Sequence, residues 1–364
     1  PDLDRLLVQV ERPDGITVAL HRDALGRLDS LHFDRGSQSL AYHATTGHLT
    51  TLNAPDSVIL GYRYDGPLVT RRASSGRVLG NVAWAYNRAF LPDTQYVNEA
   101  GIIYQYDRDL LLTGAGALAI ERDDSTGFEL GTTLGSITTS LGYNDHGEAQ
   151  TEQSLFGAIA IFDAATTRDD LGRITERTEQ ASGDTSRTLT YVYDPLTGRL
   201  REVWRGTNRL QHFGYDANGN RDTLIGSQPS DTLTATFDAQ DRLLRHGGTA
   251  YRYGANGELA QKIAGSDTTR FSYDALGNLI RVKFQNGDSI RYVIDGRNRR
   301  VGRIANGSWT QRLLYQDQLE PVAEVDGSGT VLARFVYGRR SHVPDYIVEA
   351  ESTYGIVSVH LGSV

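Results

Sequence analysis

The sequence of 364 residues contains no cysteine and no methionine, and it has only 9 prolines. Without cysteine the chain has no disulfide framework, no thiolate zinc site and no cysteine nucleophile. The lack of cysteine does not show whether the protein works in an oxidising or a reducing compartment, because a secreted protein with a large enough fold needs no disulfides. Methionine is missing even at position 1, so we expect the chain to be part of a longer or processed product.

Long apolar runs and an excess of positive charge are also missing. The longest apolar run, Phe156 to Phe162, is far too short to span a bilayer, and no signal-peptide pattern is visible. Lys and Arg number 37 against 45 Asp and Glu, which gives a net charge of −8. This balance gives no excess of positive charge with which to bind nucleic acid. We therefore expect no nucleic-acid partner, and the short apolar runs lead us to expect no membrane span.

The sequence is instead rich in turn residues and tyrosine, with 39 glycines and 19 tyrosines. Around residue 274, Phe271 and Tyr273 lie two apart and share one face of a strand. Asp274 favours the first position of a turn, where its carboxylate accepts a backbone N–H two residues on. Gly277 tolerates a positive φ angle. The segment therefore predicts a strand, a compact turn and a returning strand.

This pattern recurs about fifteen times, with a spacing of about 21 residues. Its copies lie near Asp23, Tyr42, Asp65, Asn87, Asp107, Asp169, Asp194, Asp216, Asp238, Gly254, Asp274, Asp295, Tyr315 and Tyr337, with divergent copies near Asp123 and Tyr143. A single hairpin cannot bury its own apolar face, whereas stacked hairpins can. We therefore predict an all-β fold in which antiparallel β-hairpin repeats form a spiralling, curved β-sheet shell, part of a hollow barrel or cocoon.

Three copies carry a specific resemblance, and they are Tyr193-Asp194-Pro195-Leu196-Thr197-Gly198, Tyr215-Asp216-Ala217-Asn218-Gly219-Asn220 and Tyr273-Asp274-Ala275-Leu276-Gly277-Asn278. They resemble the YD repeat of the Rhs and YD-repeat superfamily. The stretch Tyr337-Gly338 … His360-Leu361-Gly362-Ser363-Val364 resembles the segment that leads into the Rhs-associated core. We accordingly expect a repeat shell over residues 1–340 and this leading segment over residues 341–364.

The resemblance implies a function as well as a fold. In bacterial members the shell commonly encloses a toxic C-terminal polypeptide, and in animal teneurins a related shell serves cell adhesion. We expect the structural shell of a secreted or cell-surface protein that encapsulates a C-terminal toxin or effector, with other shell or secretion-system components as further partners. Roughly 30 strands at ~4.8 Å spacing make a strip of about one to one and a half turns, so we expect part of a larger shell.

Two alternatives stay open. One is an extracellular adhesion module, of the teneurin-like or wall-associated type, that binds carbohydrate or a partner protein. Stacked tyrosine rings could bind sugars, but packing in the core explains these rings more simply. The resemblance also implies self-cleavage at an Asp-Pro-x-Gly segment that lies, in the family, beyond the position of Val364. The stretch from Gly114 to Ile161 keeps the period poorly, and we expect a change of curvature or an inserted element there.

No motif in the sequence predicts a catalytic, cofactor-binding or metal-binding residue, and we expect no enzyme activity from this chain and no cofactor. Several residue groups could suggest a site, but each has a simpler structural interpretation as part of a turn. The groups are Gly114-Ala115-Gly116 for a dinucleotide, His43 and His48 for a metal, Asp123-Asp124 and Asp169-Asp170 for calcium, and Asn306-Gly307-Ser308 for glycosylation. Aspartates placed by a 21-residue period are scaffolding, because a catalytic pair is needed only once.

Overall fold

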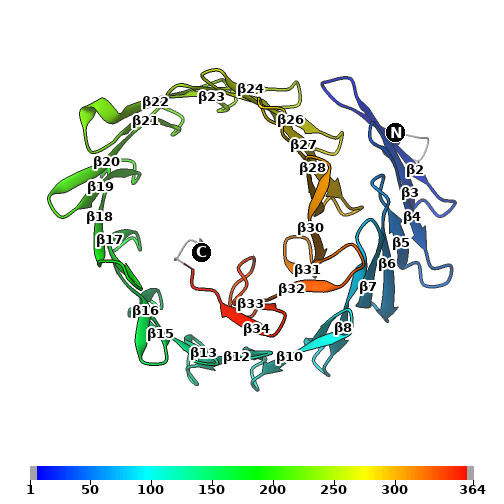
Figure 1. The fold of residues 1–364 in the computed structure, drawn as a ribbon, viewed down its shortest axis with the longest axis horizontal. Coiled ribbons are helices and arrows are strands. Elements are labelled where there is room, and N and C mark those ends of the chain that lie inside the picture. Colours follow the sequence, from blue (N-terminus) through cyan, green and yellow to red (C-terminus); the bar gives the residue numbers. More distant parts are fainter. Residues whose placement is uncertain (1–5, 359–364) are drawn as a thin grey trace. The chain divides into compact units, whose positions relative to one another are not determined.

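The structure, a computed structural model that describes residues 6–358, consists almost entirely of β-strands (Figure 1). Within this range there are 34 strands and one 3₁₀ turn, η1 (Pro229–Asp231), and no α-helix. No helix in the described range has the length and apolar character to cross a membrane. The predicted all-β fold of antiparallel hairpin repeats is confirmed. The motif at 360–364 lies outside the described residues.

The chain divides into two compact units, and the first comprises residues up to 105 together with residues 252–356. Its first strands are β1 (Gln9–Glu11), β2 (Thr17–Arg22), β3 (Leu28–Phe33), β4 (Gly36–Tyr42), β5 (Leu49–Asn53), β6 (Val58–Asp65), β7 (Leu68–Gly76), β8 (Gly80–Tyr86), β9 (Pro92–Val97) and β10 (Ala100–Tyr106). Its last strands are β25 (Leu259–Ala264), β26 (Asp267–Tyr273), β27 (Leu279–Lys283), β28 (Ser289–Ile294), β29 (Arg300–Ala305), β30 (Ser308–Tyr315), β31 (Pro321–Val325), β32 (Val331–Val336), β33 (Tyr346–Glu349) and β34 (Ser352–Gly355).

The second unit comprises residues 106–251 and the segment after residue 356. Its strands are β11 (Leu112–Ala115), β12 (Leu118–Arg122), β13 (Glu129–Leu134), β14 (Ile137–Tyr143), β15 (Ala149–Phe156), β16 (Ile159–Arg168), β17 (Ile174–Ala181), β18 (Arg187–Tyr193), β19 (Leu200–Arg205), β20 (Asn208–Tyr215), β21 (Arg221–Ile225), β22 (Thr232–Phe237), β23 (Leu243–His246) and β24 (Thr249–Tyr253). Strands β12 to β16, in the stretch that keeps the period poorly, pair consecutively like their neighbours.

Hairpin turns explain how one sequence pattern builds the whole sheet. Turns of the Asp274 kind alternate along the chain with tight two-residue turns such as Asn306-Gly307, where both residues have positive φ. Within each of the series β1–β10, β11–β24 and β25–β34, a strand pairs antiparallel with the next, for example β26 with β27 and β27 with β28. A register shift beside the repeat tyrosine, as between Ser272 and Tyr273, bends the strand at the Asp turn.

Two turns differ from their sequence interpretation. Asp65 is the last residue of β6 and pairs with Leu68, so the turn is made by Gly66 and Pro67. After Asp295 the positive φ falls on Asn298, at 60°, and not on Gly296. Gly296 serves another purpose, since an added Cβ would meet the Leu52 side chain at 2.5 Å. Local propensity located both turns but did not specify which residues form them.

The core of unit 1 lies where its early strands meet its late strands face to face (Figure 1). Val58 from β6 packs in one cluster with Val293 from β28 and Val322 from β31, and all three side chains are fully buried. We call strands β1–β10 the first layer and strands β25–β34 the second layer. Neither layer could bury its apolar face alone, so the two layers stabilise each other.

Candidate functional site

The repeat turn is a compact polar site built around one carboxylate. In the turn after β28, Asp295 Oδ1 accepts the backbone N–H of Arg297 at 2.9 Å and that of Arg299 at 3.0 Å. The Arg299 guanidinium binds Asp295 Oδ2 from Nε at 2.8 Å and from Nη2 at 2.6 Å. Turns at Asp23, Asp169 and Asp238 repeat this geometry with Arg27, Arg173 and Arg242. The carboxylate is therefore fully engaged in shaping the turn.

Each of several turns is linked to the next repeat by a tyrosine. The Arg173 guanidinium stacks over the ring of Tyr193 at 4.6 Å, and the Tyr193 hydroxyl donates to the Ile174 carbonyl at 2.8 Å. Tyr215 stacks in the same way under Arg199 and donates to the Leu200 carbonyl at 2.6 Å. The turn region thus provides both the cation and the carbonyl that hold the following tyrosine.

Sequence reasoning located the Tyr-Asp pairs but missed two members of this linkage. It did not assign a role to the arginine four residues after the aspartate or to the tyrosine hydroxyl. The arginine had a visible signal, because Arg27, Arg173, Arg242 and Arg299 occupy the same place after their aspartates. The acceptor of the hydroxyl had no signal, because any residue supplies a backbone carbonyl.

Two tyrosine hydroxyls, one with a hydrogen-bond partner and one without, predict different effects of Tyr→Phe substitution on stability. Tyr337 is 8% exposed and donates to the Pro321 carbonyl at 2.8 Å, so Tyr337→Phe leaves a partly buried carbonyl with one partner fewer. We expect a loss of about 1 kcal/mol in the free energy of unfolding. Tyr62 is 7% exposed, and its hydroxyl has no partner among residues 6–358. Tyr62→Phe should be neutral or stabilising in denaturant titrations without added anions, and equal losses in both variants would contradict this assignment.

The turn aspartates also predict how stability depends on pH. Hydrogen bonds from Ser125 and Thr126 lower the pKa of Asp123, those from Thr197 lower the pKa of Asp194, and Ser328 does most to lower the pKa of Asp326. A carboxyl with a lowered folded-state pKa stabilises the fold above its ordinary pKa of 3.8. That contribution is lost as the pH falls below this value through the lowered pKa.

We therefore expect denaturant midpoints to fall between about pH 5 and about pH 3, a window around the ordinary carboxyl pKa. The triple variant Asp123→Asn, Asp194→Asn, Asp326→Asn should show a shallower fall. We expect asparagine to preserve the turn, since Asn87 and Asn144 already accept the backbone N–H groups two and four residues on, as Asp326 does. If the denaturant midpoint of the triple variant falls as steeply with decreasing pH as that of the parent, these three carboxylates do not cause the loss of stability.

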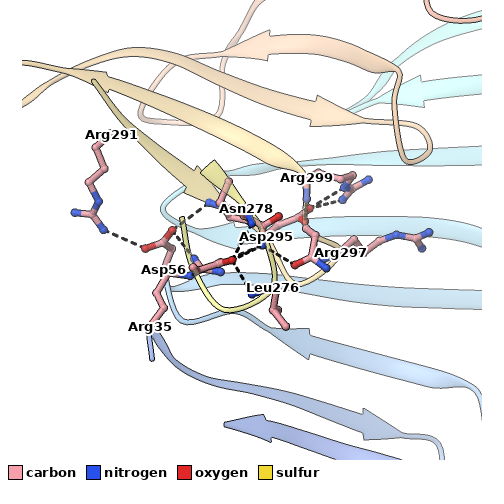
Figure 2. A network of polar contacts seen from close by, with 11 residues as sticks. Arg35, Asp56, Leu276, Asn278, Arg291, Asp295, Arg297 and Arg299 are labelled. Atoms are coloured by element: carbon pink, nitrogen blue, oxygen red, sulfur yellow. Dashed lines mark hydrogen bonds and ion pairs between the residues drawn. The ribbon is translucent and has the colours of Figure 1, made fainter. Parts of the chain in front are cut away.

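A second polar site joins the two layers of unit 1 (Figure 2). Asp56, in the turn between β5 and β6, is 7% exposed and accepts hydrogen bonds from three donors. Arg35 from the first layer donates at 2.8 Å, and from the second layer Arg291 donates at 3.0 Å and the Ile294 backbone N–H at 3.1 Å. A buried carboxylate with this many donors is fully satisfied.

Asp274 extends the same network. Its carboxylate is fully buried, accepts the backbone N–H groups of Leu276 and Asn278, and lies 3.1 Å from Arg35 Nε. On the other side of the turn, the Ala275 backbone N–H donates to Asp34 of the first layer at 3.0 Å. Arg35 therefore lies between a carboxylate of each layer. We call Asp34, Arg35, Asp56, Asp274 and Arg291 the layer seam.

Further contacts continue the junction along the strands, and the partners are separated by 221 to 262 positions in the chain. Arg334 of β32 is 6% exposed and donates to the carbonyls of Ala100 at 2.7 Å and Gln95 at 2.9 Å. Burial lowers the pKa of Arg334. The Gln38 side chain donates to the Gly296 carbonyl at 3.0 Å. The two layers of unit 1 are thus joined by specific polar bonds as well as by apolar contact.

The residue groups singled out in the sequence lie apart from this seam. His48 stacks on Tyr64 at 4.6 Å, and His43 Nδ1 accepts the Thr45 and Thr46 backbone N–H groups within its turn. Gly116 lies in the β11–β12 turn with φ at 60°. Asn306 uses its side chain to bind the Ser289 backbone N–H and Asp288. No cluster of three or more potential metal ligands occurs among residues 6–358.

Comparisons with known proteins match this architecture. The family model described as Teneurin YD-shell matches residues 2–364. Mouse Teneurin-3 is 24% identical over 359 residues, which are 93% of this chain and 13% of the relative. Human Teneurin-4 is 25% identical over 312 residues, 82% of this chain and 11% of the relative. The toxin protein Tse5 of Pseudomonas aeruginosa is 31% identical over 121 residues, 30% of this chain and 9% of that protein.

Solved structures with the same fold come from a toxin complex. The crystal structure of TcdB2-TccC3-Cdc42 matches with a TM-score of 0.55 at 12% identity and covers 93% of this chain and 22% of that chain. The structure of TcdB2-TccC3 without its hypervariable C-terminal region matches with a TM-score of 0.53 at 13% identity, over 96% of this chain and 22% of that chain. The chain spans only about a tenth of the length of the curated relatives named above.

Proposed function

Because this chain belongs to the Teneurin YD-shell family, we propose that it forms the wall of a protein shell that encloses a polypeptide. We take the enclosed polypeptide to be a C-terminal toxin or effector of the full-length product. In this proposal the protein is secreted or held at a cell surface, and other shell or secretion-system components are its further partners. The wall itself carries out no reaction and needs no cofactor or metal.

The layer seam is the observation that carries this proposal. A wall that retains a polypeptide must resist opening between its layers, and buried ion pairs that cross them favour one register over all others. Arg35 contacts Asp56 of its own layer and Asp274 of the other, so a shifted register would leave buried charges unpaired. The turn aspartates support the same function, since their repetition is suited to a scaffold.

Proteolysis of the full-length product tests enclosure. We expect the polypeptide downstream of residue 364 to survive limited digestion in the native protein, and to be cut when Asp56→Ala weakens the seam. Asp169→Ala, which alters a turn of unit 2 and no residue of the seam, is the matched control and should preserve protection. Rapid cleavage of the downstream polypeptide in the native protein would contradict enclosure.

Adhesion is the second candidate function, and the relatives named teneurin favour it. Exposed aromatic side chains such as Tyr354, 53% exposed, would then contact a carbohydrate or a partner protein. Binding on a glycan array that is lost in Tyr354→Ala would support adhesion.

We further propose that residues 1–340 are the repeat wall and that residues 341–364 lead into a core domain. Two truncated chains, ending at residue 340 and at residue 364, test this division. We expect the shorter chain to keep the β-sheet circular dichroism signal of the longer one, and its failure to fold would contradict the boundary.

A further inference from the structure

Two buried donors between the layers of unit 1 lack acceptors. Tyr62 on β6 and Arg72 on β7 are cross-strand partners and share one sheet face. The hydroxyl of Tyr62 and the Nε of Arg72 have no hydrogen-bond partner within residues 6–358, and both atoms are buried. Arg72 Nη1 is engaged, because it donates to the carbonyls of Tyr315 at 3.3 Å and Gln316 at 3.1 Å. Buried donors of this kind are normally satisfied.

The surroundings of these donors carry excess positive charge. Burial lowers the pKa of Arg72 to about 10, with contributions from the charges of Arg299 and Arg297. The nearby carboxylate of Asp295 is taken by Arg299, which contacts it at 2.8 Å and 2.6 Å. Arg297 is exposed on the same turn, and its guanidinium makes no ion pair in the described part of the chain (Figure 2). An anion is the missing group that would balance these charges.

We propose that Tyr62, Arg72 and Arg297 form a binding site for a small oxyanion at the junction of the two layers. The Tyr62 hydroxyl and Arg72 Nε would donate to its oxygens from the buried side. Arg297 would close the site from the solvent side, where its exposure leaves a route of entry. Guanidinium groups match the oxygens of phosphate and carboxylate in this way.

Two kinds of anion could occupy the site, and both would accept hydrogen bonds from the same donors. A free tetrahedral ion such as phosphate brings more acceptor oxygens than the donors require, whereas a carboxylate brings two. The ring of Tyr62 lies 5.6 Å from the Arg72 guanidinium and 6.4 Å from the ring of Tyr64, so aromatic faces border the buried side. Either anion would tie the first layer to the second and raise the stability of unit 1.

Calorimetric titration of the 364-residue chain with inorganic phosphate, and separately with acetate, tests the site at constant ionic strength. We expect saturable binding of one ion, and a melting temperature that rises with phosphate beyond the rise in sodium chloride. Binding of phosphate alone indicates a tetrahedral ion, and binding of acetate as well indicates that a carboxylate also occupies the site. Each of these results supports the proposal.

Matched variants locate the binding. Arg297→Gln should weaken phosphate binding at least tenfold, and Tyr62→Phe should weaken it while leaving the anion-free protein folded. Arg281→Gln removes another exposed arginine, on β27, and should leave phosphate binding unchanged. Absence of saturable binding, or binding that both site variants leave unchanged, would overturn the proposal.

Discussion

Asp56→Ala is expected to lower the free energy of unfolding of unit 1 by about 3 kcal/mol, near the lower end of the range for breaking a buried ion pair. The variant removes an acceptor from Arg35, Arg291 and the Ile294 backbone N–H at once. The loss stays near the lower end for two reasons. Arg35 keeps Asp274 as a partner, and the Arg291 side chain is 44% exposed, so water replaces part of what it loses.

Guanidinium-chloride unfolding of the 364-residue chain, followed by tryptophan fluorescence, measures this loss. Trp84 and Trp309 both pack against the apolar core between the layers, so their fluorescence reports on unit 1 once Trp204 of unit 2 is replaced by Phe in all variants. Asp169→Ala serves again as the control, because it removes a carboxylate paired with arginine in unit 2. A seam variant that unfolds at the same denaturant concentration as the parent would show that the buried ion pairs contribute nothing to the layers.

Gly76→Ala is expected to destabilise the first layer by a similar amount, about 3 kcal/mol, for two combined reasons. Gly76 has φ at 83°, a conformation that costs an L-residue roughly 1–2 kcal/mol. An added Cβ would also overlap the Ser57 carbonyl oxygen, which already accepts the Arg77 backbone N–H at 3.1 Å. Backbone atoms yield less than side chains, so the turn between β5 and β6 must move.

Gly26→Ala separates these two contributions. Gly26 has φ at 77°, and an added Cβ there meets no atom within 4 Å. Its substitution should therefore cost only the conformational part, roughly 1 kcal/mol. Thermal unfolding of both variants gives the comparison, and equal losses at the two positions would mean that the overlap with Ser57 is relieved without cost.

Local turn chemistry made much of the fold predictable from sequence. Asp274 binds the backbone N–H groups of residues two and four positions on, and Gly277 takes φ at 82°, as its position after the aspartate predicts. Asn306-Gly307 forms a tight hairpin turn for the same reason. These turns depend only on residues close together in the chain, so a short stretch of sequence is enough to predict them.

The layer seam could not be predicted in this way. Asp56 follows Pro55 in a short turn outside the Tyr-Asp pattern, and the N–H of Ile294 that it binds lies 238 positions away. Nothing in either local sequence specifies that pairing. Gly296 illustrates the same limit, because its sequence context suggested a turn glycine, whereas the structure uses its missing side chain to admit Leu52. Contacts between layers depend on residues more than 200 positions apart in the chain.

Hydrogen exchange of the 364-residue chain, read by mass spectrometry, tests most directly whether the two layers form one locked wall. In Asp56→Ala we expect peptides covering residues 52–62 of the first layer and 288–296 of the second to lose protection together, while a peptide covering residues 188–204 of unit 2 keeps its protection. Loss of protection in only one of the two layers, or an equal loss in unit 2, would contradict the account.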